Sequence, residues 1–77
     1  MLVEIYGTED CRYCEDALEL AQENELPVLY KELYQDFDME EFMQLFPTAK
    51  TFPQIIVDGI YIGGYTDFVE VMEMANE

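Results

Sequence analysis

The sequence has 77 residues, a length that suits one small domain, residues 1–77. Hydrophobic residues make up 51% of it and aromatic residues 14%, which is too apolar for a disordered acidic tail. Eighteen acidic residues against three basic ones give a net charge of −15 at pH 7. Because nucleic acids and anionic membranes attract proteins through Lys and Arg, this balance excludes DNA and RNA as direct ligands and disfavours a membrane surface.

The charge and the N-terminus also bear on location. The acidic surface serves solubility in the simplest interpretation, and steering toward a basic partner or adaptation to high salt are the alternatives. The first residues include Glu4 and show no cationic stretch before a long apolar run, and no apolar run approaches the ~20 residues that span a bilayer. We therefore expect a cytoplasmic protein, in a compartment where thiols are kept reduced.

The first half of the chain predicts a strand, a helix and a second strand. Residues 2–6 form a short apolar run, and a turn follows. From Cys11 the pattern becomes helical, with apolar residues on one face. These residues are Cys14, Ala17, Leu18 and Ala21. The helix is expected to end near Asn24, before Pro27, and residues 28–33 read as the second strand.

The second half predicts two more helices with a hairpin between them. Asp38 and Glu41 resemble a capping box at the start of a helix that Pro47 ends. Residues 54–57 and 60–62 flank Asp58-Gly59, a strong hairpin signal. The expected apolar faces of the two helices are Met39, Phe42, Met43 and Phe46, and Phe68, Val71, Met72 and Ala75.

The predicted order of elements is β-α-β-α-β-β-α. A helix joins the first two strands, so they should be parallel with a right-handed crossover, whereas the last two are antiparallel. We expect an α/β fold, a three-layer sandwich in which a four-stranded mixed sheet carries helices on both faces. The apolar helix faces, and all five Met residues, are expected to lie in the core.

Two cysteines open the first predicted helix. A thiolate is the form that attacks a disulfide, and the start of a helix favours negative charge by about 0.3–1 kcal/mol. We therefore assign Cys11 as the nucleophile, and Cys14, one turn further in, as the resolving thiol that attacks the mixed disulfide. Arg12 lies between them and is expected to lower the pKa of Cys11, against nearby carboxylates that would raise it.

This C-x-x-C pair is also half of a common zinc site. The chain has no further Cys and no His, so one chain cannot supply the four ligands of a structural zinc site, although two chains could share a zinc ion or an iron–sulfur cluster. A structural disulfide is a third alternative, but so short a loop restricts the unfolded chain little. The position of the pair, after a strand and at a helix start, favours redox catalysis with no bound metal.

Three separated segments resemble the glutaredoxin family, whose fold is thioredoxin-like. Cys11-Arg12-Tyr13-Cys14 resembles the family's Cys-Pro-Tyr-Cys, Thr51-Phe52-Pro53 its Thr-Val-Pro with a cis proline peptide, and Gly63-Gly64-Tyr65-Thr66-Asp67 its Gly-Gly-x-x-Asp turn. The resemblance spans nearly the whole chain. It implies an enzyme, a thiol–disulfide oxidoreductase that reduces protein disulfides and glutathione mixed disulfides, with glutathione as co-substrate.

The resemblance also implies a glutathione site. In the family, the residue before the proline, here Phe52, offers backbone hydrogen bonds to the cysteinyl part of glutathione. Thr66 and Asp67 would hold its γ-glutamyl end, Tyr13 would flank the sulfur, and Lys50 would meet the glycine carboxylate. The implied glutathione-binding residues are Tyr13, Lys50, Thr51, Phe52, Pro53, Gly64, Tyr65, Thr66 and Asp67.

Simpler interpretations of these segments stay open, namely a strand entry at residues 51–53, a turn at Gly63-Gly64 and a solvated Lys50. The net charge of −15 should also repel anionic glutathione, so we expect weak, salt-dependent binding. The expected partners are glutathione and disulfide-bearing proteins, with ribonucleotide reductase as one candidate, and we expect a monomer.

Two other functions stay open. A thioredoxin-like electron carrier reduced by a flavin reductase would use the same cysteines, although the turn at residues 63–67 and the absence of tryptophan favour glutathione. A scaffold in which two chains bridge an iron–sulfur cluster is the other. Cys14 disfavours the scaffold, because resolving a mixed disulfide is a redox task.

Overall fold

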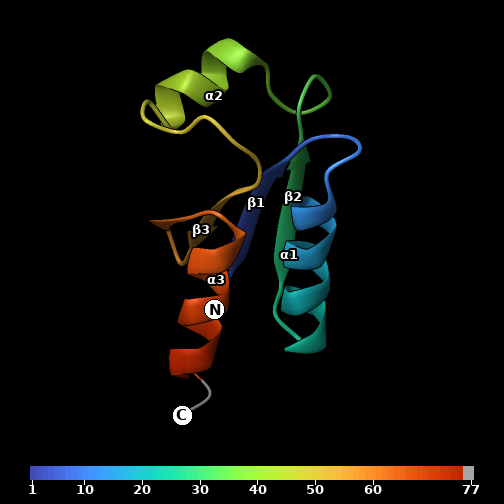
Figure 1. Ribbon diagram of the computed structural model, residues 1–77, viewed down its shortest axis with the longest axis vertical. Coiled ribbons are helices and arrows are strands. Elements are labelled where there is room, and N and C mark those ends of the chain that lie inside the picture. The colour runs from blue at the N-terminus through green and yellow to red at the C-terminus, as the bar shows by residue number, and fades with distance from the viewer. Residues whose placement is uncertain (76–77) are drawn as a thin grey trace.

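The computed structural model describes residues 1–75 and contains four strands and three helices in the predicted order. Figure 1 shows their arrangement. The elements are β1 (Val3–Gly7), α1 (Arg12–Glu23), β2 (Val28–Glu32), α2 (Met39–Leu45), β3 (Gln54–Val57), β4 (Ile60–Gly63) and α3 (Tyr65–Ala75).

The strands form one mixed sheet in the order β2-β1-β3-β4. β1 pairs in parallel with β2, so that Ile5 lies opposite Tyr30, and it pairs antiparallel with β3, so that Ile5 also lies opposite Ile55. β4 returns antiparallel beside β3. At the hairpin between them Asp58 and Gly59 have φ values of 51° and 80°, the left-handed conformation that a tight two-residue turn requires. The predicted sheet and hairpin are confirmed.

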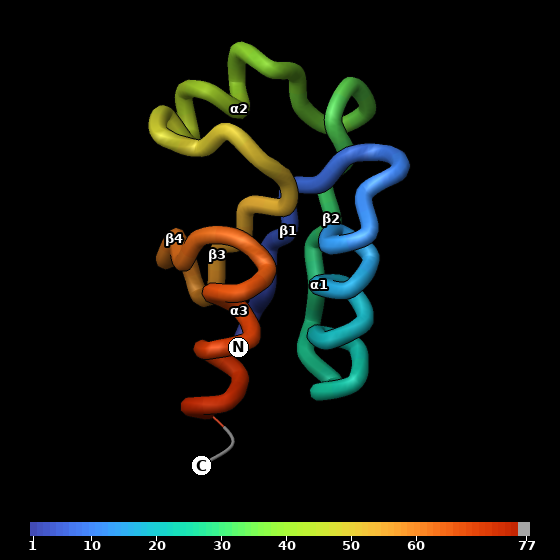
Figure 2. The backbone as a smooth tube through the Cα atoms, in the orientation of Figure 1, coloured from blue at the N-terminus to red at the C-terminus, as the bar shows by residue number. Residues whose placement is uncertain are grey.

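α1 and α3 pack side by side on one face of the sheet (Figure 2). The small side chains of Ala17 and Ala21 let α1 approach the strands closely, and Phe68 of α3 fills the space beside them. The buried core on this face is completed by Val3, Ile5, Ile55, Val57 and Met72. The face predicted for the first helix is therefore the buried one.

α2 belongs to a second, aromatic core on the other face. Tyr6 of β1 points away from the first core, and its ring meets Phe37 and Phe46 edge-on, with 5.1 Å between ring centroids in each pair. Phe42 lies in the same cluster. Asp38 begins the helix as predicted, because its Oδ1 accepts a hydrogen bond from the Glu41 backbone N–H at 2.8 Å. Helices thus cover both faces, which confirms the three-layer α/β sandwich of thioredoxin-like type.

Some predicted core positions are wrong. Met43 is 60% exposed, whereas Phe42, Phe46 just after α2 and, in part, Met39 pack in the aromatic core. Met1 and Met74 are exposed as well, so the five Met residues do not act together as core. The stripe of α3 is buried at Phe68 and Met72 but exposed at Ala75, in its last turn. No helix within residues 1–75 is long and apolar enough to cross a membrane.

Candidate active site

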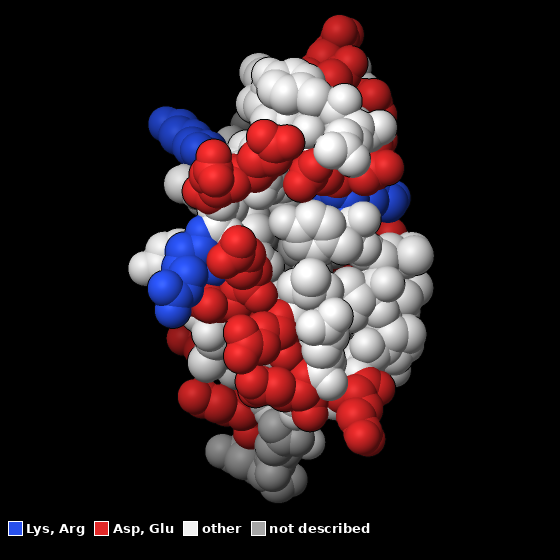
Figure 3. Space-filling model, turned by 90° about the vertical axis from the view of Figure 1, so that its right-hand side faces the viewer, with Lys and Arg blue, Asp and Glu red and all other residues white. Residues whose placement is uncertain are grey.

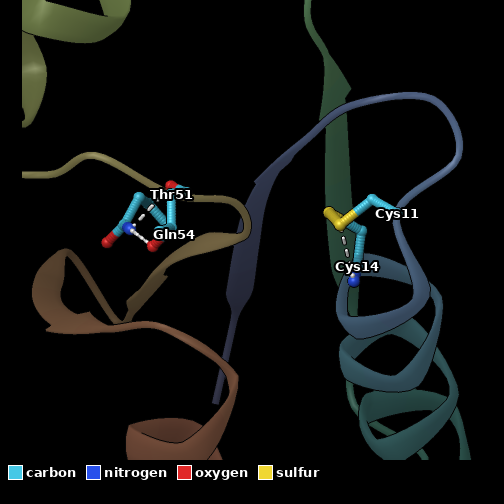
Figure 4. Close-up of a disulfide and its surroundings, with 4 residues drawn as sticks. All are labelled: Cys11, Cys14, Thr51 and Gln54. Carbon is cyan, nitrogen blue, oxygen red and sulfur yellow. Dashed lines mark hydrogen bonds between the residues drawn. A yellow bond between two sulfur atoms is a disulfide. The ribbon is translucent and has the colours of Figure 1, made fainter.

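Cys11 and Cys14 lie at the start of α1 and are joined as a disulfide (Figure 4). Cys11 is the N-cap of the helix and is partly exposed, whereas Cys14, in the first turn, is fully buried. The two sulfurs therefore differ in their access to solvent and to a substrate. This difference is what the predicted roles of nucleophile and resolving thiol need, and those roles stay predictions.

The sulfur of Cys11 accepts a hydrogen bond from the backbone N–H of Cys14, at 3.2 Å between nitrogen and sulfur. The first bond within the helix backbone runs from the Glu15 N–H to the Cys11 carbonyl. The amides of the first turn therefore face the end of the helix at which Cys11 lies. This environment favours a negative charge on the Cys11 sulfur over a neutral thiol.

Arg12 is 82% exposed, and its Nε donates a hydrogen bond to Asp16 Oδ1 at 3.2 Å, one turn along α1. This hydrogen bond and the charge of Asp16 raise the pKa of the Arg12 guanidinium above its ordinary value. The pair is the only ion pair among residues 1–75. Asp16 is one of the nearby carboxylates that the sequence predicts to raise the pKa of Cys11. The opposite effect of Arg12 on that pKa stays a prediction.

A groove of about 620 Å³ lies beside Tyr13, the residue just before Cys14. Three segments far apart in sequence line it: Tyr13 from α1, residues 48–54 ahead of and into β3, and residues 64–67 at the start of α3. The lining includes all nine residues that the family resemblance implies for glutathione. The rings of Tyr13 and Tyr65 stack with their centroids 5.7 Å apart and 22° between their planes, which joins two of these segments.

The segment before β3 forms one wall of the groove. Its Phe52–Pro53 peptide bond is cis, as the resemblance implies. The disulfide projects from the start of α1 toward the loop that carries Thr51 (Figure 4). Lys50, also in the wall, is exposed, and no carboxylate of residues 1–75 pairs with it. A positive charge is thus available to an anionic ligand.

The start of α3 forms the opposite wall. The first bond within this helix runs from the Phe68 N–H to the Gly64 carbonyl, so the preceding amides are the unpaired donors of a helix start. Asp67 Oδ2 accepts a hydrogen bond from the Gly64 N–H at 3.0 Å. Gly63 has φ of +118°, and a side chain there would overlap the Asp67 carboxylate, so this tight turn requires glycine. Backbone N–H donors that suit an anion and the Asp67 carboxylate thus lie together at the start of α3.

Gln54 is a site residue that sequence reasoning missed. It is buried, and its Nε2 donates a hydrogen bond to the Thr51 carbonyl at 2.9 Å (Figure 4). Its Oε1 accepts the hydroxyl of Tyr61 in β4. Gln54 therefore ties the groove wall to the sheet. Its signal in the sequence is a lone amide beginning the apolar run 54–57.

Comparison with known proteins decides the family. The family model described as Glutaredoxin matches residues 3–62. The chain belongs to the glutaredoxin family. Reduced Escherichia coli glutaredoxin is 32% identical, with 100% of each chain covered and a TM-score of 0.73. The oxidised form of that protein is 31% identical, with 95% of this chain and 94% of that one covered and a TM-score of 0.78.

The fold is shared more widely than the sequence. Buckwheat glutaredoxin in complex with glutathione is 18% identical, with 95% of this chain and 69% of that one covered and a TM-score of 0.70. None of the curated proteins gives a significant match. As a glutaredoxin with a close Cys11–Cys14 pair, the enzyme is a thiol–disulfide oxidoreductase with a redox-active disulfide. In the described part of the chain, no three Cys, Asp or Glu side chains gather as a metal-binding group.

Proposed function

We propose that the enzyme uses glutathione to reduce glutathione mixed disulfides and protein disulfides through Cys11 and Cys14. The observation that carries the proposal is the groove of about 620 Å³ that Tyr13 of the cysteine motif lines together with two distant segments of the chain. Buckwheat glutaredoxin, which has the same fold, binds glutathione in a solved complex. That likeness supports the proposal at the level of the fold.

The charges of the groove suit a glutathione molecule lying along it. Lys50 on one wall would attract the glycine carboxylate, and the free amides at the start of α3 would hold the γ-glutamyl carboxylate. Oδ2 of Asp67 already accepts the Gly64 N–H, and the other oxygen of this carboxylate would accept a hydrogen bond from the γ-glutamyl amine. The Phe52 backbone would align the cysteinyl part, with its sulfur near Tyr13 and Cys11.

Reduction of a protein disulfide proceeds by two thiol–disulfide exchanges, whereas a glutathione mixed disulfide needs only the first, after which glutathione frees Cys11. The Cys11 thiolate attacks one sulfur of the substrate disulfide, and the other sulfur leaves as a thiolate that takes up a proton. The Cys14 thiolate then attacks Cys11 Sγ, releases the second product thiolate and forms the Cys11–Cys14 disulfide. Two glutathione molecules restore the dithiol. The first attacks Cys11 Sγ, breaks the Cys11–Cys14 bond and releases the Cys14 thiolate; the second attacks the glutathione sulfur bound to Cys11, releases the Cys11 thiolate and gives glutathione disulfide.

We propose that disulfide-bearing proteins are the macromolecular partners, that ribonucleotide reductase is one candidate among them, and that the chain acts as a monomer. The groove is open enough for the disulfide to meet a protein substrate, since Tyr13 beside it is 60% exposed. The mass in solution, measured by light scattering with and without a substrate protein, tests the monomer.

One assay separates glutathione from a flavin reductase as the source of electrons. The protein is given a small glutathione mixed disulfide with glutathione, glutathione reductase and NADPH, and the assay is repeated with thioredoxin reductase in place of glutathione and its reductase. We expect turnover in the first system. Turnover in the second system alone would overturn the proposal.

A Cys14→Ser variant tests the separate roles of the cysteines. Reduction of glutathione mixed disulfides needs only Cys11, so we expect it to persist in this variant. Reduction of protein disulfides needs the second exchange and should be lost. Loss of both activities in a folded variant contradicts the assignment.

A further inference from the structure

The hydroxyl of Tyr30 in β2 and the sulfur of Cys14 both border the space left open by Gly7. Tyr30 lies opposite Ile5 in the parallel register, and its side chain packs on the same face of the sheet as α1. Strand side chains lean along the strand, so a tyrosine can reach the next position on that face, which is Gly7. A methyl group at Gly7 would overlap the Tyr30 hydroxyl and would lie 3.2 Å from Cys14 Sγ. The hydroxyl and the sulfur therefore flank one small space.

Cys14 needs a hydrogen-bond donor in its reduced state. Its side chain is fully buried, and burial disfavours the thiolate on which the second exchange depends. The Cys14 backbone N–H points to Cys11 and does not serve its own sulfur. The Tyr30 hydroxyl forms no hydrogen bond with any of residues 1–75, so it is available.

The hydroxyl of Tyr30 acts as a donor and keeps its proton. Burial raises the pKa of Tyr30 above its ordinary value, and the charges of Glu32 on the same strand and Glu15 on α1 add to this effect. The phenol therefore keeps its proton at neutral pH. A neutral O–H that faces a thiolate forms a charge-assisted hydrogen bond, which is stronger than one to a neutral thiol.

We propose that the Tyr30 hydroxyl donates a hydrogen bond to Cys14 Sγ when this sulfur is a thiolate, which makes Tyr30 a positioning residue of the resolving step. When a thiolate attacks Cys11 Sγ, the S–S bond breaks and its electron pair stays on Cys14 Sγ, where the hydroxyl stabilises it. In the reverse direction the hydrogen bond raises the fraction of Cys14 that is ready to attack. The inference rests on the roles proposed for the cysteines and is independent of glutathione.

The direct test titrates Cys14 alone. Thiolate absorbance is followed against pH in a Cys11→Ser variant, with and without Tyr30→Phe. Because a hydrogen bond to a charged group changes an equilibrium by roughly tenfold or more, we expect Tyr30→Phe to raise the pKa of Cys14 by about one unit. Tyr34→Phe is the matched control, since Tyr34 is 76% exposed. An unchanged or lower pKa in Tyr30→Phe overturns the proposal.

A second measurement tests the resolving step without glutathione. Reduction of insulin disulfides, with dithiothreitol as reductant, should be roughly tenfold slower in Tyr30→Phe than in Tyr34→Phe. Gly7→Ala closes the same space from the other side, so its effect and that of Tyr30→Phe on the Cys14 pKa should not add in the double variant. An unchanged rate of insulin reduction in Tyr30→Phe contradicts the proposal. So do fully additive effects of Gly7→Ala and Tyr30→Phe on the Cys14 pKa. These outcomes are independent of the glutathione assay above.

Discussion

The sulfur of Cys11 lies among groups with opposite effects on its charge. The Cys14 N–H and the helix start favour the thiolate, whereas the carboxylates of α1 oppose it. Arg12 is predicted to favour the thiolate, and its hydrogen bond with Asp16 should offset much of its field outside the pair. The charge state of the Cys11 sulfur therefore depends on how far the Asp16 carboxylate cancels the charge of Arg12.

Arg12→Ala is expected to raise the pKa of Cys11. The substitution removes a positive charge from the residue that follows Cys11 in sequence and leaves Asp16 without its partner. Asp16→Asn should shift the pKa in the opposite direction, because it removes a negative charge and frees Arg12. Thiolate absorbance of the Cys14→Ser variant against pH measures both. An unchanged or lower pKa in Arg12→Ala refutes the role assigned to Arg12.

Lys50→Gln is expected to raise the KM for glutathione by roughly two- to fivefold, with little change in kcat, because an exposed charge contributes modestly to binding. Steady-state kinetics with a small mixed disulfide measure the effect. Lys31→Gln is the matched control: it removes the same charge, but Lys31 donates to the Tyr6 hydroxyl, away from the groove. Equal changes in both variants would assign the effect to net charge and count against a local role of Lys50.

At the scale of elements, one buried side chain connects the groove wall with the β3–β4 hairpin. Gln54 begins β3, receives the Tyr61 hydroxyl from β4 and donates to the Thr51 carbonyl. No buried side-chain N or O atom within residues 1–75 lacks a hydrogen-bond partner. Since buried polar groups are costly when unpaired, Gln54 specifies the path of the wall as well as stabilising it.

Gln54→Ala is expected to lower the free energy of unfolding by about 1–3 kcal/mol, because the Tyr61 hydroxyl and the Thr51 carbonyl lose their partner. Tyr61→Phe should cost less, about 0.5–1.5 kcal/mol, since it removes one hydrogen bond. Urea denaturation followed by circular dichroism measures both. Gln44→Ala, on the exposed side of α2, is the control and should change stability little. Equal stabilities of Gln54→Ala and Gln44→Ala would contradict this account.

The whole molecule carries its negative charge with little internal compensation. Asp and Glu side chains run over the side of the molecule on which α1 lies (Figure 3). The full sequence has a net charge of −15, and residues 1–75 contain a single ion pair. A field of this size acts on every anion that approaches, and salt screens it with a Debye length of about 10 Å at 0.1 M.

Catalytic efficiency with glutathione is expected to rise as salt increases from low ionic strength, because screening weakens the repulsion between two anions. Measuring kcat/KM for glutathione across a series of NaCl concentrations, at fixed pH, tests this expectation. A neutral small thiol as reductant is the control and should show a weaker dependence. A steady fall with salt would indicate that local attraction at Lys50 and Arg12 dominates.

The sequence by itself determined the order of the elements and the local chemistry of their ends. Helical spacing, the Asp38 cap and the Asp58-Gly59 turn each depend on residues within about four positions of one another, so their physics is readable from neighbours. The place of Cys11 at a helix start is of this kind. The same reasoning overestimated burial at Met43, because a helical stripe does not tell how much of it a short helix will cover.

Only the tertiary structure decided which distant residues meet. The sequence names the groove residues through family resemblance, but their gathering around one space depends on how α1, the segment before β3 and α3 pack. The Gln54–Tyr61 hydrogen bond and the meeting of the Tyr30 and Cys14 side chains at the space beside Gly7 leave no periodic signal. Such contacts follow from strand register and from the absence of one side chain, which pattern and propensity do not encode.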